Sequence, residues 1–216
     1  VLGIGMKFKG SPKQIFYTQI MLDDMDVAAA RKGKGFYRTK VAAQFGYKGY
    51  DLFKVKHLDF QTELNLVRPF VYAHKAPEQS YTNYNQSLAH PLGANFLESV
   101  TFINYWYKHW TASAKLQFAV QGRDANFEHN GSNIFLSDYL IAPNLGTAYN
   151  NTFLQGVKTR LINVEARGGY LINPKINLAI EAFVNYRYVK NTNIRQDNLF
   201  MGISFRTNMF NRYTDF

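Results

Sequence analysis

The residues best suited to chemistry lie in one stretch, YTNYNQSLAHPLGANF, at positions 81–96. Its aromatic rings can stack on sugar rings, while its amide and imidazole groups can hydrogen-bond to sugar hydroxyls. The candidate glycan-binding residues are Tyr81, Asn83, Tyr84, Asn85, Gln86, His90 and Asn95. The stretch also holds four apolar residues that can instead fold it inward as a plug, with its polar groups satisfying one another: Leu88, Pro91, Leu92 and Phe96. The sequence slightly favours the plug and leaves both hypotheses open.

Other arrangements that could carry chemistry are sparse. There is no Cys, no GxSxG or HExxH sequence and no glycine-rich phosphate loop. We therefore predict no catalytic residue, no metal site, no cofactor and no enzyme activity. Two weaker alternatives stay open: an acid–base pair built on His74, His90 or His129, and Ca²⁺ binding by the acidic segment at 23–26. A hydrated loop end is the simpler interpretation of that acidic segment.

Apolar and polar residues alternate through most of the chain, which predicts β-strands. In segment 58–66, Leu58, Phe60 and Leu64 share one face while Asp59 and Gln61 lie on the other. The pattern predicts nine strands, at 1–9, 14–22, 37–49, 57–72, 97–108, 110–122, 157–172, 176–189 and 198–209. Their connections are alternately short and long, as in outer-membrane barrels. We therefore predict an all-β domain over 1–216, forming a transmembrane antiparallel up-and-down β-barrel in the bacterial outer membrane.

The distribution of aromatic residues supports a face that contacts lipid, because such faces carry aromatic belts at both interfaces. One predicted belt comprises Phe16, Tyr47, Tyr50, Trp106, Trp110 and Tyr170. The other comprises Phe36, Tyr37, Phe70, Tyr72, Tyr186 and Tyr188. The alternative is a soluble β-sandwich or lipocalin-like barrel, but strands of roughly nine to sixteen residues are long for globular proteins, where about five or six is typical.

The direction of the strands leads to a further expectation. Single-chain barrels usually have an even number of strands with both termini in the periplasm. Counting back from the last strand places the first residue outside the cell. We therefore expect an N-terminal part with at least one more strand, and a full barrel of more than nine strands.

The polar face would line the interior of such a barrel, where charges should be paired or hydrated. Folding 157–172 onto 176–189 places Arg167 opposite Glu181, and folding 37–49 onto 57–72 places Lys48 opposite Asp59. These pairs are predicted to brace a polar interior. A surplus of cations offers another interpretation, a passive diffusion channel for small anionic solutes; those cations are Lys40, Lys115, Arg123, Arg187 and Arg206.

The formal net charge of +10 suits several anionic partners, so its placement must decide between them. Lys and Arg are dispersed among the alternating strands, which argues against nucleic-acid binding. A cluster of Arg31, Lys32 and Lys34 lies in a predicted outer loop, where it can meet anionic lipopolysaccharide or capsule or simply keep the loop hydrated. The expected partners are outer-membrane lipid and lipopolysaccharide.

Two segments resemble a known group of proteins. LDFQTELNLVRPFVYAH at 58–74 and NYNQSLAHPLGANF at 83–96 resemble Bacteroidetes outer-membrane β-barrels of the Wzi-like capsule-assembly and RemB-like gliding-motility family. Ser87 departs from the Pro typical of that pattern, and the resemblance is specific over about forty residues. It implies a non-catalytic barrel at the cell surface, linked to capsular polysaccharide or glycan attachment, or to other outer-membrane proteins of a gliding or secretion assembly.

Overall fold

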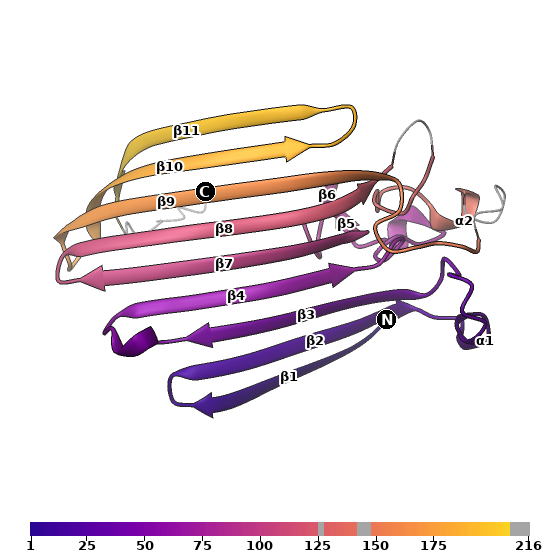
Figure 1. Ribbon diagram of the computed structural model, residues 1–216, viewed down its shortest axis with the longest axis horizontal. Coiled ribbons are helices and arrows are strands. Elements are labelled where there is room, and N and C mark those ends of the chain that lie inside the picture. Colours follow the sequence, from indigo (N-terminus) through magenta and orange to yellow (C-terminus); the bar gives the residue numbers. More distant parts are fainter. Residues whose placement is uncertain (125–127, 142–147, 208–216) are drawn as a thin grey trace, which may run out of the picture.

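Nine long strands form a single antiparallel sheet, seen with its strands running horizontally in Figure 1. The structure, a computed structural model, describes residues 1–124, 128–141 and 148–207. The strands are β1 (Leu2–Ser11), β2 (Gln14–Asp24), β3 (Lys40–Gly49), β4 (Leu58–Val67), β7 (Phe96–Tyr107), β8 (Trp110–Arg123), β9 (Val157–Asn173), β10 (Leu178–Lys190) and β11 (Arg195–Arg206). Each pairs with the next in this order. The nine predicted strands are confirmed as elements of one sheet.

The sheet is open in the part of the chain that the structure describes. β1 and β11 are its two edges and are not paired with each other. The all-β antiparallel architecture is therefore observed, while closure into a barrel and insertion into a membrane are not.

The connections differ between the two ends of the sheet, as predicted. The connections at the left in Figure 1 are short, and the longer ones gather at the right, where the short turn between β10 and β11, at 191–194, is an exception. These loops carry the short elements α1 (Val27–Arg31), η2 (Pro77–Gln79), α2 (Asp138–Ile141) and a two-stranded hairpin of β5 (Thr82–Asn83) and β6 (Gln86–Ser87). At the opposite end lies η1 (Leu52–Lys54). No helix among the described residues is long and apolar enough to cross a membrane.

The strand boundaries lie within three residues of the predicted ones, except at the end of β4. Segment 57–72 was expected to be one strand, but β4 ends at Val67. Pro69 cannot donate a ladder hydrogen bond, and Phe70 and Tyr72 adopt positive φ angles, so the chain leaves the sheet. β11 begins at Arg195, three residues before the prediction, and positions 208–209 of the predicted strand lie outside the described residues.

One face of the sheet is apolar and largely exposed. A row of successive strand partners crosses all nine strands through Phe8, Phe16, Tyr47, Thr62, Thr101, Leu116, Val164, Tyr186 and Leu199. The described helices and strands leave most of this face uncovered, and η1 approaches it at the turn end, where Leu52 lies beside Gly49. Large side chains along it are accordingly exposed, with Phe8 at 63% and Met201 at 70%. Such a continuous apolar surface marks an interaction site.

The predicted aromatic belts are only partly correct. Tyr37, Phe70 and Tyr72 are buried within the loops at the right of Figure 1 instead of lying on the apolar face. Trp106 pairs with Thr111 on the polar side of the sheet, because its neighbour Tyr107 occupies the apolar side opposite Trp110. The boundary error at β4 explains Phe70 and Tyr72, because the alternation of β4 extends only to Arg68, whose amide still bonds to the Val41 carbonyl, and ends at Pro69.

Candidate functional site

The polar face carries a hydrogen-bonded chain of side chains that begins on β2. The Tyr17 hydroxyl donates to the Glu63 carboxylate on β4. Gln44 on β3 donates to Glu63 at 3.3 Å and to the Asn65 oxygen at 3.0 Å. Gln61 also donates to Glu63, at 2.8 Å. Residues two apart on a strand share a face, and this spacing is what places the groups within reach of one another.

Glu98 on β7 lies at the centre of this chain and is almost fully buried. Its carboxylate accepts hydrogen bonds from Asn65 at 2.9 Å and from Gln117 on β8 at 2.7 Å. His90 Nε2 lies 2.9 Å from the same carboxylate and completes a three-sided enclosure. The buried charge is therefore compensated by three partners, as burial of a carboxylate requires.

The chain continues to β10. Asn163 on β9 donates to the Gln117 oxygen at 3.5 Å and accepts from Asn185 at 3.0 Å. Together these contacts link strands β2 to β10 across the polar face. We call this set the amide–carboxylate chain: Tyr17, Gln44, Glu63, Asn65, Glu98, Gln117, Asn163 and Asn185.

The two predicted ion pairs have different outcomes. Arg167 and Glu181 lie 3.3 Å apart, but diagonally, because Arg167 is opposite Phe183. The predicted pairing of Lys48 with Asp59 is wrong. Lys48 is opposite Gln61 and its ammonium lies over the Tyr17 ring, while Asp59 is opposite Asn104.

Two of the cations assigned to an unpaired surplus have carboxylate partners. Lys40 is completely buried, where it donates to the Ala73 carbonyl at 2.6 Å and forms an ion pair with Asp138 of α2. Arg206 lies 2.9 Å from Glu181. Lys40 therefore anchors the α2 loop to the start of β3, and two of the five cations proposed to line a channel are neutralised by carboxylates.

The loop at 81–96 divides into an exposed tip and an internal part. At the tip, the hairpin turn places Tyr84 and Asn85 at φ angles of 47° and 58°, as a type I′ turn requires. The Tyr84 side chain is 93% exposed. Asn83 and Gln86 flank it and are also exposed. Tyr81, in contrast, packs against the core with its ring 5.7 Å from that of Tyr72.

The second half of the loop folds back over the polar face. The His90 ring stacks on the buried Phe96 ring with centroids 4.3 Å apart. Gln121 on β8 donates to the carbonyls of Leu92 and Ala94. The seven candidate residues thus do not form one site, because His90 is held internally and only the tip is available to a ligand.

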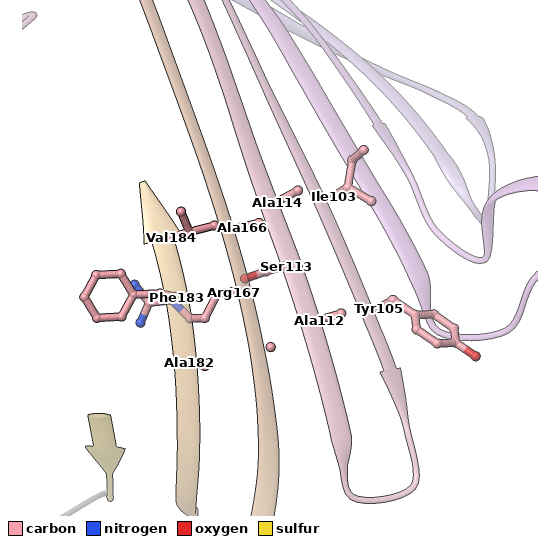
Figure 2. Close-up of a pocket in the computed structure, with 11 residues that line it drawn as sticks. Ile103, Tyr105, Ala112, Ser113, Ala114, Ala166, Arg167, Ala182, Phe183 and Val184 are labelled. Carbon is pink, nitrogen blue, oxygen red and sulfur yellow. The ribbon is translucent and has the colours of Figure 1, made fainter. Parts of the chain in front are cut away.

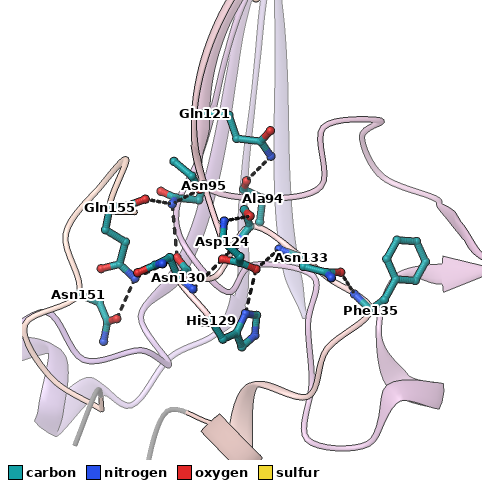
Figure 3. Close-up of polar contacts among 12 residues, drawn as sticks. Ala94, Asn95, Gln121, Asp124, His129, Asn130, Asn133, Phe135, Asn151 and Gln155 are labelled. Carbon is teal, nitrogen blue, oxygen red and sulfur yellow. Dashed lines mark hydrogen bonds and ion pairs between the residues drawn. The ribbon is translucent and has the colours of Figure 1, made fainter. Parts of the chain in front are cut away.

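Asn95 is a structural residue at the loop end of the sheet, and Figure 3 shows it among its partners. It is fully buried, and its amide nitrogen donates to the carbonyls of Gly122 at 2.8 Å and Gln155 at 2.9 Å. Its oxygen accepts from the Leu154 amide at 2.8 Å. A φ angle of 58° suits Asn better than most residues. Asn95 therefore joins β8 to the segment before β9.

Asp124 organises the neighbouring loop (Figure 3). Its carboxylate accepts from the backbone amides of Asn130 at 2.6 Å and Asn133 at 3.1 Å, and lies 3.2 Å from His129 Nδ1. Burial raises the pKa of Asp124, but hydrogen bonds and the charge of His129 outweigh it, so the pKa lies below its ordinary value. Among the described residues, no group pairs with His129 Nε2.

Carboxylates of the acidic segment at 23–26 bind other groups of the protein instead of remaining free for a metal ion. Asp23 accepts from the Tyr72 amide at 2.8 Å and lies 3.2 Å from His74. Asp26 caps α1 by accepting from the Ala29 amide at 2.9 Å. Burial, followed by the charge of Asp23, raises the pKa of Tyr72 to about 12. No group of three potential metal ligands occurs in the parts of the chain described.

A shallow hollow of about 540 Å³ interrupts the apolar face, and Figure 2 shows its lining. Small residues on adjacent strands produce it, chiefly Ala112, Ala114, Ala166 and Ala182. Ile103 lies at its border (Figure 2). The hollow is almost wholly apolar, so it offers packing space and no reactive group.

The residues that connect the loops were not identified from the sequence. The sequence pattern predicts an unpaired Lys40 and gives no signal for its partner Asp138, which lies 98 residues further along the chain. A usable signal was the Asn130–Gly131 turn six residues after Asp124, because such turns place successive amides within reach of one carboxylate.

Comparisons with known proteins add no assignment. No protein-family model matches the chain, and neither the search of curated proteins nor that of solved structures found a match.

Proposed function

We propose that this chain forms the wall of a β-barrel in the bacterial outer membrane. The observation that carries the proposal is the exposed apolar face, which extends over nine strands. The opposite face holds the amide–carboxylate chain, a continuous polar surface of hydrogen-bonded side chains. One apolar and one polar face, with long loops at one end, is the arrangement expected of such barrels.

The proposed role is non-catalytic and is exerted at the cell surface, in capsular polysaccharide or glycan attachment or in a gliding or secretion assembly. Support comes from the likeness of segments 58–74 and 83–96 to the capsule-assembly and gliding-motility family. It also comes from the hairpin tip, where Tyr84 and the adjacent amides are free to contact a glycan. Aromatic stacking beside amide groups is suited to sugar recognition.

Surface labelling of intact bacteria tests the location. An epitope inserted between Tyr84 and Asn85 should be accessible to antibody, because the hairpin lies at the long-loop end. The same epitope inserted between Pro174 and Lys175, in the tight turn between β9 and β10, is the matched control and should be labelled only after permeabilisation. Recovery of the protein in the soluble fraction, with neither epitope displayed, would contradict the proposal.

Binding to immobilised surface polysaccharides tests the role. Tyr84→Ala should reduce binding, whereas Tyr107→Ala, an exposed tyrosine at the other end of the sheet, should leave it unchanged. Steady open currents in planar bilayers would favour the diffusion channel instead. The segment at 88–95 lies over the polar face, so we expect such currents to be absent.

A further inference from the structure

A cavity of about 500 Å³ lies at the long-loop end, separate from the hairpin tip. Its lining joins the α1 loop, the end of β4 and the segment before β9. Two cations, Lys34 and Arg68, and two aromatic residues, Phe36 and Phe153, contribute to it. Its volume is in the range of small-molecule sites.

The cations of this cavity lack partners within the protein. Arg68 Nε is buried, and no described residue accepts a hydrogen bond from it. No described carboxylate lies within ion-pair distance of Arg68 or Lys34. A buried guanidinium N–H without an acceptor costs free energy, which an anionic ligand would recover.

Backbone hydrogen bonds hold the cavity in shape. The Asn150 amide donates to the Lys34 carbonyl at 2.6 Å, and the Asn151 amide donates to the Gly35 carbonyl at 2.9 Å. Gly35 has a φ angle of 60°, and a Cβ there would lie 2.5 Å from the Asn151 carbonyl oxygen. The two segments can therefore approach this closely only with glycine at position 35, and the lining is organised before any ligand arrives.

The position of Arg68 indicates the kind of anion. Its amide still bonds to the Val41 carbonyl at 3.1 Å, so it continues the alternation of β4. That alternation places Arg68 on the apolar side, directly beyond Leu64 and Leu66. Cations and aromatic residues at the end of a lipid-facing surface lie at the level of lipid headgroups.

We propose that this cavity binds the phosphate group of a membrane-lipid headgroup, held by Arg68 and Lys34 at the rim of the apolar face. The inference rests on the proposed membrane location. Phe36 and Phe153 would cover the glycerol carbons adjoining the phosphate. Arg68 supplies a fixed planar donor, and the exposed Lys34 supplies a second charge.

Calorimetric titration of the folded chain in non-ionic detergent tests the site. The probes are dioctanoyl phosphatidic acid, dioctanoyl phosphatidylcholine and glucose 1-phosphate. The first should bind saturably, and the other two should bind at least about tenfold more weakly. Arg68→Gln should raise the dissociation constant for phosphatidic acid about tenfold or more, and Lys34→Gln about fivefold.

Lys32→Gln is the matched control, because Lys32 belongs to the same basic cluster but does not line the cavity. It should leave binding unchanged. If Arg68→Gln fails to fold, Lys34→Gln decides the test, because Lys34 is exposed and its replacement should not affect folding. Equal affinity in Lys34→Gln and Lys32→Gln would overturn the proposal, and so would tight binding of glucose 1-phosphate. A chain that displays the hairpin epitope yet shows no Lys34-dependent binding would refute this inference alone and leave the membrane location intact.

Discussion

Single buried polar residues determine how the loops attach to the sheet. Asn95 was assigned to a glycan site because its amide can bind sugar, yet it is fully buried and joins three segments. Nothing in the local pattern distinguishes an amide that faces solvent from one that accepts and donates inside the protein. Tyr84 is exposed for a local reason, in contrast, because Tyr84 and Asn85 themselves form the turn of the hairpin.

Replacing Asn95 should destabilise the loop end. Asn95→Ala leaves the Gly122 and Gln155 carbonyls without a donor, and each unsatisfied buried group costs about 1–3 kcal/mol. We expect the free energy of unfolding to fall by about 2–4 kcal/mol, measured by denaturant titration in detergent micelles. Asn83→Ala, at the exposed tip, should change it by less than about 0.5 kcal/mol. Equal effects would show that Asn95 does not join these segments.

The loop around Asp124 should depend on pH. Its pKa is lowered in the folded protein, so ionised Asp124 contributes stability above the ordinary value of 3.8. That contribution is lost as the pH falls through the lower folded value. Hydrogen exchange at the Asn130 and Asn133 amides, corrected for intrinsic rates, should therefore show less protection below about pH 4. In Asp124→Asn protection should be low at pH 7 and independent of pH; unchanged protection in that variant would contradict the assignment.

The elements were predicted more reliably than their alignment. Alternation identified all nine strands because each has one apolar face, and a period of two is easily recognised over ten or more residues. It could not predict the register, since the assumed Lys48–Asp59 pair differs from the observed Lys48–Gln61 pair by two residues. Attraction between exposed charges is too weak to set the alignment of a strand.

Disulfide trapping can test the observed register, and the absence of cysteine from the chain leaves no background. Residues directly opposite on antiparallel strands have Cα atoms within disulfide range. Lys48→Cys with Gln61→Cys should therefore cross-link on mild oxidation, measured by a mobility shift on non-reducing gels. Lys48→Cys with Asp59→Cys is the matched control and should remain reduced. Preferential cross-linking of the second pair would support the alignment predicted from the sequence, in which Lys48 is opposite Asp59.

At the scale of the whole molecule, the main feature is the chemical difference between the two faces of the sheet. A largely uncovered apolar surface and a hydrogen-bonded polar surface lie back to back through a single layer. The sequence indicated this two-sidedness, and it also indicated the sorting of short and long connections. Burial of aromatic residues in the loops could not be predicted, because it depends on contacts between segments far apart in the chain, such as Tyr37 with Phe70.

Adjacent residues on β10 offer a direct comparison of the faces. Val184 lies on the apolar face near the middle of the strand, and Asn185 lies on the polar face. If the apolar face contacts lipid, Val184→Arg should cost about 2–4 kcal/mol of folding free energy in bilayers. Asn185→Arg should cost less, about the value of one hydrogen bond, about 1 kcal/mol. Folded fractions in liposomes of equal composition measure both, and a larger effect at Asn185 would contradict the assignment of the faces.

The amide–carboxylate chain has a consequence for how the strands find one another. A strand displaced by two residues would still turn its apolar side outward, so several alignments are equivalent as far as hydrophobic contact is concerned. The same displacement moves each side-chain donor about 7 Å along its strand, beyond reach of its acceptor. Glu98, with three donors from different segments, would then be left as an uncompensated buried charge. The hydrogen bonds of the polar face therefore select one alignment among several that hydrophobic contact alone would allow.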